Sequence, residues 1–261
     1  MNKLMPILYQ AISKGVVLSV QSEKAINDTI GDHRMIVEYL EQRNAEGAKN
    51  AMRMLMQFID VSTWERAMHY EVFRNSVQPQ YCVTFDVDVT NFLSYVKKRN
   101  DSFTFSFVYA VTKCANEIQA FRCRFVDGKP AIFETIHTSF TYLNRDTELF
   151  KAVNVPMQEK MEDYVALAKK TEENQTDYFT TPMANDIYQF SSFPWVSYTH
   201  ISHTESGRKD NTTPLFDWGK FYEKNGKIWM PLSVQVHHSF VDGVHIGKFA
   251  EKLQCCLDGF E

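Results

Sequence analysis

The sequence predicts an α+β fold, a sandwich of sheet and helices preceded by a short all-helical extension. Two observations support this fold class. Strand-like and helix-like patterns follow one another beyond residue 60 without strict βαβ repetition, and residues 1–59 carry helical periodicity only. We therefore expect a helical extension at residues 1–59 and an α+β domain at residues 60–261.

The extension is predicted to contain three helices. Residues 4–18 give an irregular helical pattern, and residues 33–43 place apolar side chains on one side. A third helix follows Asn44, which favours the N-cap position, and it is predicted to continue to Ile59. Its apolar residues recur at spacings of three and four and form one stripe, namely Ala48, Ala51, Met52, Leu55, Met56 and Ile59.

Alternation with a period of two marks the first strand of the domain. Val83, Phe85 and Val87 alternate with polar residues within residues 81–90, as expected for a strand with one buried face. Apolar patterns predict further strands at residues 138–143 and 228–236. Helical patterns predict helices at residues 103–121, 159–173 and 244–257.

Composition excludes several classes of protein. The chain has 28 Lys and Arg against 32 Asp and Glu, a net charge of −4, so it lacks the positive charge with which nucleic-acid binders contact phosphates. We find no secretion signal and no run of about 20 apolar residues that would span a membrane. The five cysteines lack CxxC spacing, so we expect reduced thiols, a cytoplasmic protein and no structural zinc.

The most informative segment is HHSFVDG, residues 237–243, where the last predicted strand ends in a turn. A histidine there is held by the strand while its ring projects into a cleft, and an ordinary imidazole pKa near 6.5 suits proton abstraction. Taken alone, paired histidines are more often packed side chains. A metal site built on His238, Asp242 and His245 lacks a further ligand, so no metal is expected.

Three motifs in order resemble the chloramphenicol acetyltransferase family. They are SSFPWVSYT at residues 191–199, PLFDWGKFY at residues 214–222 and HHSFVDG, and the similarity begins near WER at residues 64–66 and passes through FDVDVT at residues 85–90. The HHxxxDG pattern also occurs in dihydrolipoyl acyltransferase cores and peptide-condensation domains. The PWVS segment and the chain length favour the antibiotic branch.

The resemblance implies a homotrimer with active sites at subunit interfaces, acetyl-CoA as co-substrate and a small hydroxyl compound, chloramphenicol first, as acceptor. His238 would be the general base, and Ser191 would donate a hydrogen bond to the oxyanion. Asp242 would pair with Arg66 and support the site, while His238 would be oriented by its own backbone. Lys220 matches a family lysine near the CoA phosphates.

Three departures from the family pattern concern the acceptor pocket. Asp217 replaces a threonine, His203 a leucine and Phe73 a tyrosine. A negative charge at Asp217 would oppose an oxyanion unless it points away, is protonated or is paired. Two alternatives therefore stay open: an O-acetyltransferase for another small hydroxyl compound, and a non-catalytic ligand-binding protein.

The extension has a resemblance of its own. HRMIVEYLEQRNAEGAKNAMRML, within residues 32–56, resembles the last helices of the ligand-binding domain of GntR-type transcription regulators. A histidine at the position of His33 can bind metal in that family, but the partner ligands would lie further upstream than this chain extends. No DNA-binding half is present.

Overall fold

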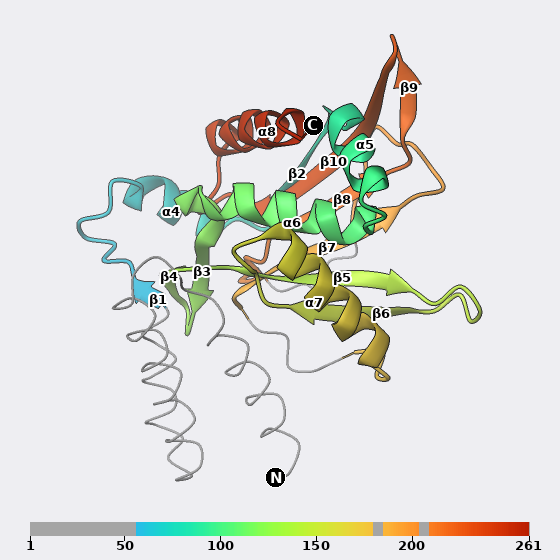
Figure 1. The fold of residues 1–261 in the computed structure, drawn as a ribbon. Helices are drawn as coiled ribbons and strands as arrows, with labels where there is room; N and C mark the ends of the chain where they lie inside the picture. The colour runs from blue at the N-terminus through green and yellow to red at the C-terminus, as the bar shows by residue number, and fades with distance from the viewer. Residues whose placement is uncertain (1–55, 180–184, 204–208, 261) are drawn as a thin grey trace, which may run out of the picture.

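The computed structural model describes residues 56–179, 185–203 and 209–260. In this part of the chain a seven-stranded sheet in the order β2-β10-β8-β7-β5-β6, with β9 beside β10, lies next to a three-stranded sheet in the order β1-β4-β3 (Figure 1). The large sheet contains β2 (Gln80–Asp88), β5 (His137–Leu143), β6 (Phe150–Val155), β7 (Ile187–Phe193), β8 (Leu215–Gly219), β9 (Tyr222–Lys224) and β10 (Lys227–His237). The small sheet contains β1 (Met56–Phe58), β3 (Cys123–Val126) and β4 (Lys129–Phe133).

The helices are α4 (Ala67–Arg74), α5 (Thr90–Lys98), α6 (Phe103–Asn116), α7 (Met161–Asn174) and α8 (Gly243–Asp258), with a short 3-10 turn at Gln119–Arg122. The α+β prediction is confirmed. Strands β7 and β8 are parallel to each other, and β5 is parallel to β7, whereas β10 is antiparallel to both β2 and β8.

One face of the large sheet is apolar and carries the core. Val234, Phe216, Phe190 and Phe140 occupy one row across β10, β8, β7 and β5, and all four are buried. Helices α6 and α8 cover this face, because Phe105 of α6 and Phe249 of α8 pack against the row (Figure 1). Burial of such aromatic side chains stabilises the fold, and truncating one of them to alanine costs about 3–5 kcal/mol.

The opposite face carries a polar row, defined here as Thr84, Ser233, Asp217 and Ser191. These residues are register partners on β2, β10, β8 and β7, one position along from the apolar row. Because successive side chains of a strand point to opposite faces, the alternation that buries Phe216 and Phe190 directs Asp217 and Ser191 the other way. The polar row positions several of the predicted site residues.

Most predicted elements are confirmed with small shifts in their ends. The strand expected at residues 81–90 is β2, and the strand expected at residues 228–236 is β10. The helix expected at residues 103–121 ends at Asn116 and is followed by the 3-10 turn. The C-terminal helix buries Ile246, Phe249 and Leu253 as the stripe predicts.

The predicted helix that ends at Ile59 is wrong over its last residues. Met56–Phe58 forms β1, which pairs with β4, and the Ile59 N–H continues the pairing to the Pro130 carbonyl at 2.9 Å. The edge of β4 offers backbone hydrogen bonds that local helical periodicity does not reveal. The other predicted helices of the extension, His33 and the GntR-like segment up to Leu55 lie outside the described residues.

Candidate active site

His238 follows the last residue of β10, and its ring lies between two aromatic side chains. The Phe73 ring of α4 stacks on it at 3.7 Å between centroids and 3° between planes, and the Tyr81 ring of β2 lies 4.7 Å away at 42°. The His238 side chain is about one-third exposed (33%). These contacts hold the imidazole in one orientation while leaving an edge open to a bound molecule.

Arg66, just before α4, connects this histidine turn to α8. Its guanidinium forms a bidentate ion pair with Asp242, in which Nη2 lies 2.6 Å from Oδ1 and Nη1 contacts Oδ2. Nε donates to the Ser239 carbonyl at 2.9 Å, and Nη2 donates to the His238 carbonyl at 2.8 Å. Hydrogen bonds from Arg66 hold the pKa of Asp242 below its usual value. The structure brings Arg66 and Asp242 together, as the resemblance implies, and Arg66 also binds the backbone carbonyls of His238 and Ser239.

We expect His238 to be oriented by its own backbone, and no ring hydrogen bond of this kind from Nδ1 is present among the described residues. The His238 carbonyl accepts from Arg66, and Nδ1 of the ring lies 3.0 Å from Oδ1 of Asp242 without forming a hydrogen bond to it. The stacked rings and the neighbouring carboxylate therefore set the orientation of the imidazole.

Sequence reasoning missed Tyr81. Its hydroxyl donates to the Val241 carbonyl at 3.2 Å, and burial raises its pKa to about 12, so the hydroxyl remains a donor near neutral pH. Tyr81 pairs in register with Val236, two residues before His238. The predicted strand alternation contained the signal, but only the pairing of β2 with β10 places this ring against His238.

His237 is a packed histidine, as predicted. It is 2% exposed, and burial lowers its pKa to about 4. Its Nδ1 accepts from the Ser239 N–H at 3.2 Å, and its Nε2 lies 3.0 Å from the Lys209 carbonyl. The two adjacent histidines thus have different environments, because His237 lies inside the fold and His238 at its surface.

Ser191 lies on β7 in the polar row, beside Asp217. It is half-buried, and its Oγ accepts a long hydrogen bond of 3.4 Å from Thr141 Oγ1. This contact uses an oxygen lone pair of Ser191 and leaves its hydroxyl proton for another acceptor. The position is therefore compatible with donation to a developing oxyanion.

Asp217 is buried and paired. Its side chain has 0% exposure, and its Oδ2 lies 2.8 Å from Nε2 of His203. Burial raises the pKa of Asp217, while His203 lowers it. A carboxylate near an oxyanion is acceptable if it points away, is protonated or is paired, and the structure shows that Asp217 is paired. Two departures from the family pattern have thus come together in one contact.

Lys220 directly follows β8 and is exposed. Its backbone N–H donates to the Val196 carbonyl at 2.9 Å, next to Trp195, which is 64% exposed. The PWVS motif, residues 194–197, therefore lies beside the segment that follows β8. A role for Lys220 at CoA phosphates stays a prediction.

Ser191 and His238 do not meet within one chain. Ser191 pairs with Asp217, and Asp217 pairs with Ser233, which lies five residues before His238 along β10. At about 3.3 Å per residue this separates the two side chains by roughly 16 Å along the strand direction, in addition to two interstrand spacings. A site that uses both residues needs more than one copy of the chain.

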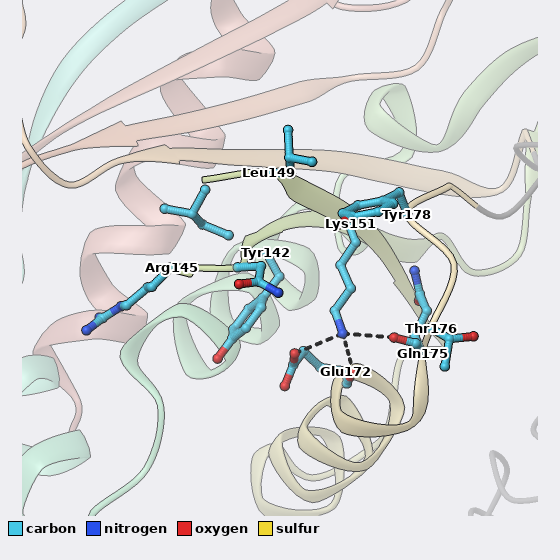
Figure 2. A pocket seen from close by; sticks show the side chains of 10 residues that line it. Tyr142, Arg145, Leu149, Lys151, Glu172, Gln175, Thr176 and Tyr178 are labelled. Atoms are coloured by element: carbon cyan, nitrogen blue, oxygen red, sulfur yellow. Dashed lines mark hydrogen bonds and ion pairs between the residues drawn. The ribbon is translucent and has the colours of Figure 1, made fainter. Parts of the chain in front are cut away.

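Two cavities among the described residues are lined by neither Ser191 nor His238. Figure 2 shows one of about 370 Å³ at the end of the β5–β6 hairpin, lined by Tyr142, Lys151, Glu172 and Tyr178 among others. The Lys151 ammonium there lies 3.0 Å from Glu172 Oε1 and donates to the Gln175 carbonyl at 3.0 Å. This cation is occupied by internal partners and offers little to a ligand.

A larger cavity of about 1060 Å³ lies on the α8 side of the Arg66–Asp242 pair and is also lined by His69 and His245. His245 accepts a hydrogen bond from the Asp242 N–H at 2.9 Å. Within residues 56–179, 185–203 and 209–260, no helix is long and apolar enough to cross a membrane. In the same residues, no cluster of three or more His, Cys, Asp or Glu side chains is arranged to hold a metal ion.

Known proteins match this chain over most of its length. A chloramphenicol acetyltransferase of Streptomyces acrimycini is 31% identical over 206 residues, covering 76% of this chain and 93% of that protein. One from Escherichia coli is 29% identical, covering 78% and 94%.

A solved chloramphenicol acetyltransferase structure superimposes with a TM-score of 0.72 at 27% identity, covering 77% of this chain and 99% of that one. The family description of chloramphenicol acetyltransferase matches residues 54–254, a range that includes β1 as well as the Arg66, Ser191 and His238 positions. The chain belongs to the chloramphenicol acetyltransferase family.

Proposed function

We propose that this protein is an acetyl-CoA-dependent O-acetyltransferase whose acceptor is chloramphenicol. The single observation that carries the proposal is the arrangement at His238: an imidazole held by Phe73, Tyr81 and the Arg66–Asp242 pair, with one edge exposed. Membership of the family supplies the reaction class. A general base needs this combination of fixed position and access to the proton it removes.

The reaction is a direct transfer. His238 takes the proton of the acceptor hydroxyl as the oxygen attacks the thioester carbonyl of acetyl-CoA, and the C–O bond forms. The negative charge on the carbonyl oxygen is stabilised by the hydroxyl of Ser191, a contribution worth about 3 kcal/mol for one such donor. Collapse of the tetrahedral intermediate breaks the C–S bond, and the proton held by His238 passes to the departing CoA sulfur. No acyl-enzyme forms.

The site is shared between copies of the chain in a homotrimer. Support comes from the distance between Ser191 and His238, which excludes a site made by one chain. Further support comes from three exposed apolar side chains that follow Ser191 in the sequence. They are Phe193, Trp195 and Val196, and an exposed apolar patch of this kind is typical of a protein interface. Lys220 beside this patch would contact the CoA phosphates.

The first experiment measures release of free CoA thiol from acetyl-CoA, with chloramphenicol, with a panel of hydroxyl compounds and with no acceptor. Chloramphenicol-dependent release supports the proposal. Release with another hydroxyl compound but not with chloramphenicol favours the second acceptor class, for which the polar His203–Asp217 contact is the specific observation. Ligand binding without release would identify a binding protein.

The shared site has its own test. Coexpression of His238→Ala chains with Ser191→Ala chains produces mixed trimers in which some interfaces retain both residues. Activity should return in the mixture although each variant alone is inactive. No recovery in mixed trimers shown to have formed would contradict a site divided between two copies.

A further inference from the structure

His203 and Asp217 both depart from the family pattern, and the structure shows that the two departures are one feature. Asp217 lies on β8 with no exposed surface, and His203 lies in the segment after Tyr198 with 18% of its side chain exposed. Their Nε2 and Oδ2 atoms are 2.8 Å apart. This distance places the imidazole and the carboxylate in direct polar contact, and His203 lowers the pKa of Asp217 against the rise that burial causes.

His203 and Asp217 stabilise each other in the folded protein. A buried carboxylate with no compensating group carries a large desolvation cost, and both oxygens of Asp217 lack another hydrogen-bond donor among the described residues. A leucine at position 203 would leave this carboxylate alone in the interior. A threonine at position 217 would remove the partner that holds the His203 ring in place.

The pair lies next to the proposed oxyanion donor. Asp217 and Ser191 are register partners on parallel strands, so their side chains lie on the same face of the sheet and side by side. Only His203 of the pair keeps accessible surface. Of this pair, only the His203 imidazole is therefore available to a molecule bound on this face of the sheet.

The chemistry of the imidazole selects the partner group. With Nε2 directed at Asp217, the remaining ring nitrogen is Nδ1, which accepts a hydrogen bond when the ring is neutral and donates one when the ring is charged. A hydroxyl group can both donate and accept, so it matches His203 in either state. An acceptor that places a purely apolar group here would leave Nδ1 of His203 without a hydrogen-bond partner, and it would therefore bind less tightly.

We propose that His203, positioned by Asp217, hydrogen-bonds a second hydroxyl of the acceptor and thereby makes the enzyme selective for diols over otherwise identical mono-alcohols. This inference rests on the proposed function, because it assigns a specificity to the same transfer reaction. His203 is the residue that touches the acceptor, and Asp217 acts through it as a positioning residue.

The test compares kcat/KM for phenylethanediol and phenylethanol, which differ by one hydroxyl, in the wild type, His203→Leu, Asp217→Thr and the double variant. The wild type should prefer the diol, and the double variant should lose about tenfold of that preference. His200→Leu, at an exposed position in the same segment, is the matched control and should keep the preference.

Thermal unfolding of the same four proteins tests the pairing independently of activity. His203→Leu should lower the melting temperature because it leaves Asp217 unpaired, and adding Asp217→Thr should recover most of that loss. Additive effects of the two substitutions would overturn the pairing. An active double variant with an unchanged diol preference would overturn the specificity and leave the proposed function standing. A wild type that releases no CoA thiol with any hydroxyl compound would overturn both.

Discussion

The His238 turn and the polar row are the two halves of the proposed site, and they differ in how their residues are held. At the turn, Arg66 contacts three residues, His238, Ser239 and Asp242, so the position of His238 depends on a local network. In the polar row, Ser191 and Asp217 are held by strand pairing, and their surroundings change with the side chains of neighbouring segments. The proposed base is therefore held by a network of contacts within one turn, whereas Asp217 depends on a partner from a different segment.

The largest expected effect is at the turn. His238→Ala should lower chloramphenicol-dependent CoA release by at least about a hundredfold, because it removes the general base, while the melting temperature changes little. His69→Ala, at an exposed histidine on α4, is the control and should retain activity. If His238→Ala kept more than about a tenth of the activity, another group would have to be the base.

Arg66→Val should cost about 3 kcal/mol of folding free energy, since it leaves the Asp242 carboxylate without its partner and both side chains are largely buried. Chemical denaturation measures this loss. Turnover should fall with it, through displacement of the His238 turn. The combination of lost activity and unchanged stability would instead place Arg66 in direct contact with the reacting groups.

The two adjacent histidines give a prediction about pH. His237 has a folded-state pKa of about 4, below the value of about 6.5 in the unfolded chain, so the unfolded state binds more protons between these values. The contribution of His237 should therefore lower the free energy of unfolding by about 2 kcal/mol as the pH drops from 7 to 5. His237→Gln should show a shallower slope in denaturation measured at both pH values, and an equal slope would contradict the assignment.

The smallest effect is expected for removal of the N-terminal residues. Removal of residues 1–55, which retains β1, should leave an active protein with nearly unchanged stability, because the family match begins at residue 54. Removal of residues 1–59 deletes one of the two partners of β4 and should lower the melting temperature more. Thermal unfolding of the two truncated chains separates these cases. Equal losses would show that β1 contributes nothing, and aggregation of both would place essential core within the extension.

The site was partly predictable from sequence because its turn is local. HHSFVDG contains the end of β10, the turn and the start of α8 in one short segment, and the family resemblance of this segment distinguished His238 from His237. The partner of Asp242 was also predicted, but only through the family resemblance, since Arg66 lies 176 residues away. Tyr81 and the pairing of His203 with Asp217 had no signal of this kind.

Sequence by itself determined the fold class, the amphipathic helices and the alternation of β2, because these patterns arise from neighbouring residues that share one buried face. Tertiary structure alone decided the order of the strands, the conversion of Met56–Phe58 into a strand and the placement of Ser191 far from His238 within one chain. The reason is that strand pairing joins backbone groups that are distant in sequence. Their register is set by which apolar faces can be buried together, and no short segment contains that information.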